Sequence, residues 1–167
     1  MKNPVLTETI TLKGIIDEDF VNYKVPSMTL MFPYCDFKCE TNGEHFCQNS
    51  SLIKEKDIII PIKNIYKRYI NNPITSAIVM QGMEPFKSWD ELYSLLFHFR
   101  IHECCTDDIV IYTGYNKDEI LNEVNELEIM FSNVIIKYGR FIPNRKSRHD
   151  DILGVTLASD NQYAERI

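Results

Sequence analysis

The chain has 167 residues, of which 44% are apolar and 25% are charged, and its formal net charge is −6 at pH 7. This length fits one domain over residues 1–167, which would bury roughly two thirds of the surface of the unfolded chain. The acidic balance argues against a protein whose main task is to grip nucleic-acid phosphates, and no apolar run approaches the roughly 18 residues of a membrane span.

Several short apolar runs have the composition of buried strands. Amphipathic segments separate these runs. Successive runs recur at intervals of about 30 residues, which is the spacing of strand–helix–strand units. In chain order the runs are Ser27–Pro33, Ala77–Met80, Ile109–Tyr112, Val134–Ile136 and Ile152–Leu157.

Three segments between these runs carry the signals of helices. Apolar residues recur at helical spacing over 62–70, and Pro61 stands where a first helical turn tolerates proline. A Ser or Asn followed three residues later by Glu has the form of a capping box, which opens a helix. The pairs are Ser88 with Glu91, for a helix through Phe99, and Asn116 with Glu119.

This alternation predicts an α/β fold with a parallel sheet of five or six strands and covering helices, because such crossovers are right-handed and parallel. The number of strands is short of an eight-fold barrel, so the expected form is a partial, TIM-like barrel. Ligands of such sheets collect at the carboxyl ends of the strands. The segments expected there are the cysteine loop, Gln81–Pro85, Thr113–Tyr115 and Tyr138–Arg140.

The cysteine loop has the sequence YCDFKCETNGEHFCQN, with Cys35, Cys39 and Cys47 and no fourth cysteine near them. Three thiolates on a four-iron cluster leave one iron open for chemistry. The alternative is zinc, because His45 would complete a tetrahedral set of three cysteines and one histidine.

The remaining cysteines are Cys104 and Cys105, which have the appearance of ordinary residues at a helix end. An odd total of five cysteines suits a reducing compartment better than a disulfide framework. The N-terminus is polar and has no apolar signal core. We therefore expect a cytoplasmic protein.

Taken together, these segments resemble the small radical S-adenosylmethionine (SAM) proteins, and most closely the activating proteins of anaerobic ribonucleotide reductases. The resemblance covers nearly the whole chain, although seven residues separate Cys39 from Cys47 where the superfamily has two. It rests on the three cysteines with Phe46 directly before the third, on Gly82-Met83-Glu84-Pro85 in the place of a GGEP segment, on Ile111–Tyr115 and on Ala158–Gln162.

The resemblance implies a single radical SAM domain with a [4Fe-4S] cluster on Cys35, Cys39 and Cys47. The amino and carboxylate groups of SAM would close the fourth iron. The implied SAM contacts are Phe46 beside the adenine, the segment of Gly82, Met83, Glu84 and Pro85 at the amino group, and Tyr112, Thr113 and Gly114 near the ribose. Glu84 has two interpretations, as a charge near the SAM amino group or as a carboxylate that bonds backbone in a tight turn.

The activity that the resemblance implies is reductive cleavage of SAM to a 5'-deoxyadenosyl radical. The expected partner is a glycyl-radical enzyme of the anaerobic ribonucleotide reductase type, with a flavodoxin- or ferredoxin-type electron donor and with neither membrane nor nucleic acid. Two alternatives stay open, a radical SAM enzyme acting on a small molecule and a zinc or iron–sulfur module that binds protein without catalysis.

A basic cluster follows the fourth run in this acidic chain. It is either a solvated loop or a group that pairs with the SAM carboxylate or docks an acidic partner surface. Its members are Arg140, Arg145, Lys146, Arg148 and His149.

Overall fold

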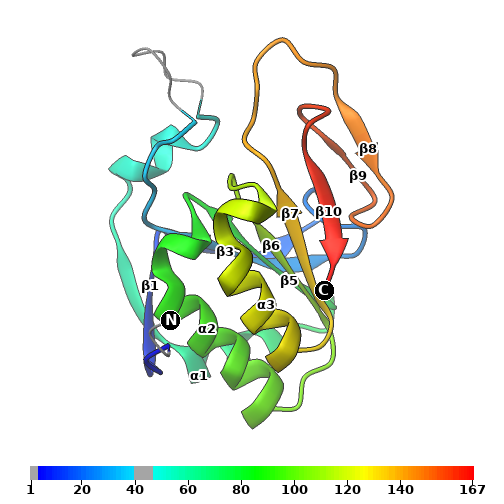
Figure 1. Cartoon of the computed structure of the whole chain (residues 1–167). Coiled ribbons are helices and arrows are strands. Elements are labelled where there is room, and N and C mark those ends of the chain that lie inside the picture. The colour runs from blue at the N-terminus through cyan, green and yellow to red at the C-terminus, as the bar shows by residue number, and fades with distance from the viewer. Residues whose placement is uncertain (1–3, 40–46) are drawn as a thin grey trace.

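The computed structural model describes residues 4–39 and 47–167, and its centre is a six-stranded sheet (Figure 1). The predictions for His45 and Phe46 lie outside the described residues. The order of the strands across the sheet is β10-β7-β6-β5-β3-β2. Their bounds are β2 Gly14–Asp19, β3 Ser27–Phe32, β5 Ala77–Gly82, β6 Asp108–Tyr112, β7 Val134–Tyr138 and β10 Tyr163–Arg166.

The four central strands, β3, β5, β6 and β7, run parallel, as the apolar runs predicted. Both edge strands run antiparallel to their neighbours, so the sheet is mixed and the prediction of a wholly parallel sheet is wrong at its two edges. The reason at one edge is the short connection from β2 to β3, because a short turn can join only antiparallel neighbours. The six strands form an open sheet, and no barrel is closed among the described residues.

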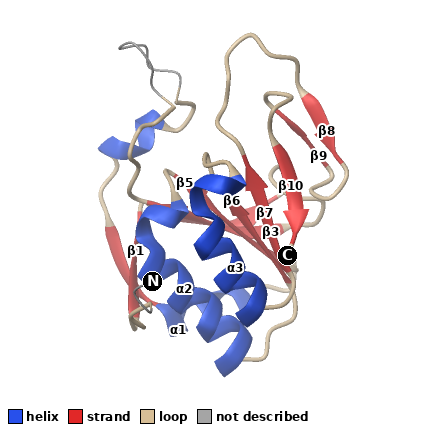
Figure 2. Cartoon of the chain, in the orientation of Figure 1, coloured by secondary structure: helices blue, strands red, loops and turns tan. Residues whose placement is uncertain are grey.

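Three helices pack on one face of this sheet (Figure 2). They are α1 Ile62–Ile70, α2 Trp89–Phe97 and α3 Leu121–Met130. Residues of the parallel strands alternate between two cores, since successive strand side chains point to opposite faces. Ile78 and Met80 join the helix side, whereas Ala77 and Val79 pack with residues from the loop after β2 and from the C-terminal segment. The predicted covering helices therefore occupy one face only.

The other face is covered by a separate two-stranded hairpin of β8 (Arg148–Asp150) and β9 (Val155–Leu157). Leu153 and Leu157 of this segment are buried in the second core. The last predicted run, Ile152–Leu157, thus supplies a hairpin strand and a turn, and not a strand of the main sheet. A further small sheet pairs β1 (Thr9–Leu12) with β4 (Ile58–Pro61).

The three helices begin where the sequence predicted, with Ser88 in the N-cap position of α2, but only one of the two predicted capping boxes is formed. Helix α1 follows Pro61 directly, and the capping box of Asn116 and Glu119 is formed ahead of α3, on a 3₁₀ turn over Lys117–Ile120. The predicted box at Ser88 is absent: a 3₁₀ turn over Pro85–Ser88 leads into α2, and the Ser88 side chain makes no capping bond.

The carboxylate of Glu91, which would complete that box, accepts hydrogen bonds from the N–H and hydroxyl of Thr11 on β1, each at 3.1 Å. It therefore fastens the small β1–β4 sheet to α2. The C-terminal end of α2 continues as a π-helical turn over His98–His102. In the described part of the chain no helix is both long and apolar enough to cross a bilayer.

Arg100, in that π-helical turn, is buried and connects the amino ends of strands β6 and β7. Its guanidinium donates to the backbone carbonyls of Cys105, Asp107, Ser132 and Asn133 at 2.6–3.1 Å. These carbonyls directly precede β6 and β7. One side chain thus satisfies four acceptors at the amino ends of two parallel strands.

Candidate metal centre and cavity

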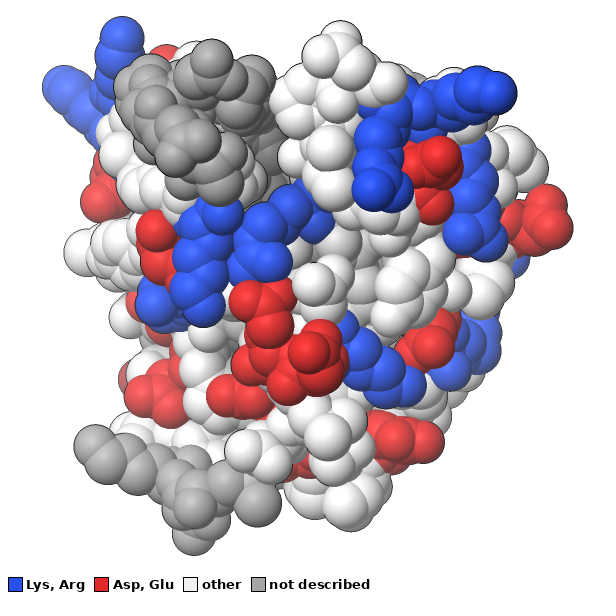
Figure 3. Space-filling model, turned by 45° about the horizontal axis from the view of Figure 1, so that its top comes forward, with Lys and Arg blue, Asp and Glu red and all other residues white. Residues whose placement is uncertain are grey.

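A cavity of about 500 Å³ opens at the carboxyl ends of the four parallel strands. Its wall includes residues that the sequence placed on this rim, from the cysteine segment, the loops after β5, β6 and β7, and the β9 segment. In Figure 3, which tilts this end toward the reader, Lys and Arg side chains gather there although the chain as a whole is acidic. The named site residues on the wall are Cys35, Cys39, Cys47, Gly82, Met83, Glu84, Tyr112, Thr113 and Gly114.

The three thiols are half-buried on this wall. Cys35 follows β3 closely, and its sulfur accepts the N–H of Phe37 at 3.3 Å. Burial, followed by the neighbouring thiols of Cys47 and Cys35, raises the pKa of Cys39 to about 11, and burial also raises the pKa of Cys35.

Within residues 4–39 and 47–167, no three Cys, His, Asp or Glu side chains are drawn together at metal-binding spacing. The donor chemistry nevertheless fits an iron–sulfur cluster, because three thiols share one cavity wall and thiolates are the ligands of such clusters. Each thiol would have to lose its proton when a cluster binds. The positive charge of the iron ions would then offset the mutual repulsion of the thiolates.

The segment after β5 lies against β3 and the cysteine segment. Gly82 has φ of 101°, and a Cβ at this position would lie 2.7 Å from the backbone nitrogen of Phe32 on β3. Only glycine permits this approach. The Met83 N–H donates to the Phe32 carbonyl at 3.0 Å, and the Asn49 side-chain amide donates to the Gly82 carbonyl at 2.7 Å. The backbone that follows Cys47 is thereby connected to the end of β5.

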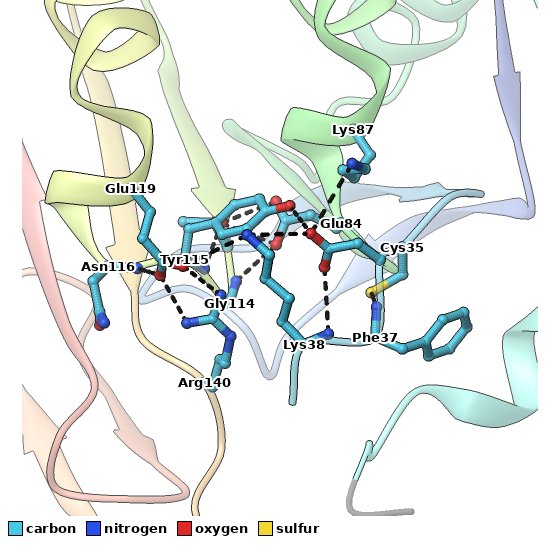
Figure 4. Close-up of polar contacts among 12 residues, drawn as sticks. Cys35, Phe37, Lys38, Glu84, Lys87, Gly114, Tyr115, Asn116, Glu119 and Arg140 are labelled. Atoms are coloured by element: carbon cyan, nitrogen blue, oxygen red, sulfur yellow. Dashed lines mark hydrogen bonds and ion pairs between the residues drawn. The ribbon is translucent and has the colours of Figure 1, made fainter. Parts of the chain in front are cut away.

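Glu84 is only 4% exposed and joins the ends of two strands. Its carboxylate accepts hydrogen bonds from the Phe86 N–H, the Thr113 hydroxyl and the Gly114 N–H at 2.9–3.1 Å (Figure 4). Burial raises its pKa to about 7, against the opposing effect of these donors. Of the two interpretations from the sequence, the carboxylate that bonds backbone in a tight turn describes this geometry.

Pro85 begins the 3₁₀ turn that follows Glu84, and it is buried beneath the rim. Tyr112 and Thr113 lie at the end of β6. The Tyr112 hydroxyl donates to the Asn22 carbonyl at 2.6 Å, which connects β6 to the loop between β2 and β3. The backbone N–H of Thr113 donates to the Lys137 carbonyl at 2.8 Å.

Tyr115 lies at the centre of a polar network that the sequence interpretation passed over. Its hydroxyl donates to Asp36, between the first two cysteines, and Lys38 and Arg140 lie 5.0 and 5.4 Å from the centre of its ring. Figure 4 shows Arg140 pointing at Glu119, with which it forms a two-point ion pair at 2.7 and 2.9 Å. The guanidinium fork of Arg140 is therefore already satisfied inside the protein.

The rest of the basic cluster is exposed. Arg145 pairs with Asp160 at 3.2 Å, while Lys146, Arg148 and His149 lie on the surface of the loop and of β8. This part matches the solvated-loop interpretation. Of the five residues of this basic cluster, Arg140 is the one that lines the cavity.

A second residue missed from the sequence is Lys137, on β7. The side chain is buried, lines the cavity and donates to the Gly139 carbonyl at 2.8 Å. Its burial lowers the pKa of the ammonium group to about 8. The sequence offered a weak signal, a lone lysine between the apolar run Val134–Ile136 and Tyr138.

A family model described as a 4Fe-4S single cluster domain matches residues 26–163. The matched range includes the four parallel strands, the three cavity cysteines and the β8–β9 hairpin. No curated protein and no solved structure matches the chain. The match favours an iron–sulfur cluster over the zinc site that the cysteine spacing left open.

Proposed function

Since the chain belongs to the family of 4Fe-4S single cluster domains, we propose that Cys35, Cys39 and Cys47 hold one [4Fe-4S] cluster used for radical SAM chemistry. The observation that carries the proposal is the position of the three thiols on one wall of the cavity at the carboxyl ends of the parallel strands. Three thiolates leave one iron of such a cluster available to a small ligand.

A reduced cluster supplies one electron, which splits the sulfonium of SAM into methionine and a 5'-deoxyadenosyl radical. The task of the protein is to hold SAM beside the three thiolates and to keep water away. The cavity at this rim is large enough for a ligand of that kind, since small-molecule sites span about 300–1,000 Å³.

The backbone after β5 is suited to receive an amino group. The N–H groups of Met83 and Glu84 already donate to β3 and to Tyr34. The Gly82 and Glu84 carbonyls accept from Asn49 and Lys87, so the Met83 carbonyl is the backbone group of this segment best placed to accept from an ammonium group. Gly82 keeps the backbone close to β3 at this point, and Glu84 fixes the neighbouring Thr113–Gly114 turn, where the ribose would lie.

The substrate class that the sequence resemblance favours is a protein glycine, on a glycyl-radical enzyme such as an anaerobic ribonucleotide reductase. The open sheet supports it, because the strands of residues 4–39 and 47–167 close no barrel around the cavity, and a loop of a partner protein can approach it. A flavodoxin- or ferredoxin-type protein would deliver the electron. One observation favours the second candidate, a radical SAM enzyme acting on a small molecule: the buried cation of Lys137 on the cavity wall.

The test is anaerobic reconstitution with iron and sulfide, followed by low-temperature EPR of the reduced protein with and without SAM and by chromatography for 5'-deoxyadenosine. We expect a four-iron signal that changes on addition of SAM, together with release of the nucleoside. Tight zinc binding without cluster or cleavage would instead identify a protein-binding module.

A pair of variants separates the cluster from general thiol chemistry. Cys39→Ala should lose both the cluster absorption and SAM cleavage while it stays folded, because Cys39 lies outside both cores. Cys104→Ala, at an exposed thiol away from the cavity, should retain both. Unfolding of the Cys39 variant would point to a structural metal.

A further inference from the structure

Lys137 is a buried cation for which the described residues provide no ion-pair partner. Its side chain is on the hairpin side of β7, and the residue is only 6% exposed. The ammonium group donates to the Gly139 carbonyl at 2.8 Å and lies 5.8 Å from the centre of the Tyr112 ring. An ammonium group has three donors, so this arrangement leaves donor capacity toward the cavity.

The Gly139 carbonyl is itself shared, because it also accepts the side-chain amide of Gln162 at 3.2 Å. Glu84 is the carboxyl group whose charge acts on Lys137. Its oxygens already accept from Phe86, Thr113 and Gly114, so it does not form an ion pair with the ammonium. A buried charge without a partner is unfavourable, and an anion from solution would relieve it.

The position of Lys137 separates it from the cysteines. It lies on β7, and three inter-strand spacings of about 4.8 Å, roughly 14 Å in all, separate β7 from β3, which leads into Cys35. An anion at Lys137 would therefore lie away from the thiols and close to Tyr112, in a cavity whose lining also includes Thr156 and Ala158 of the hairpin segment.

We propose that Lys137 is the anchor of an anion-binding subsite that takes the carboxylate or phosphate group of a small substrate, beside and separate from SAM. The inference rests on the proposed function only for the presence of SAM in the same cavity. It identifies the substrate class as small anionic molecules and thereby favours the second of the two candidate substrates.

The first experiment measures binding of inorganic phosphate and of malonate to the full-length purified chain by titration calorimetry and by thermal unfolding, against chloride at equal ionic strength. We expect one of these anions to raise the Tm of the wild-type chain by about 3–6 °C near saturation. In Lys137→Met the dissociation constant should rise at least tenfold and the shift should vanish. Lys67→Met, an exposed lysine on α1, should behave as wild type.

The Tm of the variant in chloride separates a binding role from a structural role. Methionine removes the uncompensated charge and keeps an apolar stem of similar length, so Lys137→Met should unfold at or above the wild-type Tm. A clearly lower Tm would show that Lys137 is structural and would overturn the proposal. So would an anion effect that survives in Lys137→Met, or the absence of binding of both anions to the wild-type chain.

The second experiment repeats the titration on the reconstituted protein with saturating SAM. The proposal requires the anion to bind alongside SAM with its affinity unchanged within about threefold. Displacement of the anion by SAM would overturn it and would assign Lys137 to the SAM carboxylate. Failure of SAM cleavage affects only the proposed function, because the first experiment needs neither cluster nor SAM.

Discussion

The carboxyl group of Glu84 should make the stability of the metal-free protein fall as the pH rises. Burial raises its pKa from 4.5 to about 7, so the folded chain keeps a proton that the unfolded chain releases. This contribution to stability is fully present below pH 4.5 and is lost as the pH rises through 7. At about 1.36 kcal/mol per pKa unit, the loss is about 3 kcal/mol across the window.

The assay compares the wild-type chain with Glu84→Gln by urea unfolding at several pH values between 5 and 8, followed by circular dichroism. The amide of the variant does not ionise, so the difference between the two free energies of unfolding isolates Glu84. Wild type should lose stability relative to Glu84→Gln as the pH rises. A difference that stays flat, or that moves the other way, would refute the reasoning and show that the donors from Thr113, Gly114 and Phe86 outweigh burial.

Three further substitutions test other parts of the structure. Arg100→Met should lower the free energy of unfolding by about 3 kcal/mol in urea, because the partly buried carbonyls of Cys105, Asp107 and Ser132 lose their donor; a change below about 1 kcal/mol would contradict this role. Gly82→Ala should destabilise by about 2–4 kcal/mol, since its Cβ would press on the backbone of β3, and an unchanged Tm would argue against that close approach. Met83→Gly should hold or improve SAM affinity in equilibrium dialysis, and a large loss would mean that another ligand binds at this rim.

The parallel centre of the fold was predictable because those strands are buried on both faces and therefore appear as continuous apolar runs. The edge strands were not, since an edge strand keeps polar residues. Gly14–Asp19 has the sequence GIIDED and Tyr163–Arg166 has YAER, and neither shows an apolar run. The failure of the Ser88 capping box has a tertiary cause, because β1 takes the Glu91 carboxylate.

The cysteines and the Gly82–Pro85 segment were found from the sequence because their residue types and spacing carry chemical information of their own. Lys137 gives only a weak signal, a lone lysine beside an apolar run, because its burial arises from contacts with residues distant in the sequence. Glu84 was found, but its partners Thr113 and Gly114 are 29 and 30 residues away. The local sequence around Glu84 therefore could not predict which hydrogen bonds its carboxylate accepts.

The amino ends of the parallel strands stabilise the fold, whereas their carboxyl ends form the cavity. Mutations at the two ends should therefore have different effects. Arg100 and the carbonyls that it satisfies lie at the amino ends, whereas the cavity lies at the carboxyl ends. In a library of single substitutions scored separately for cellular abundance and for activity, the two kinds of loss should map to opposite ends of the sheet. Residues on the cavity end would then be free to diverge toward new ligands while the amino end preserves the fold.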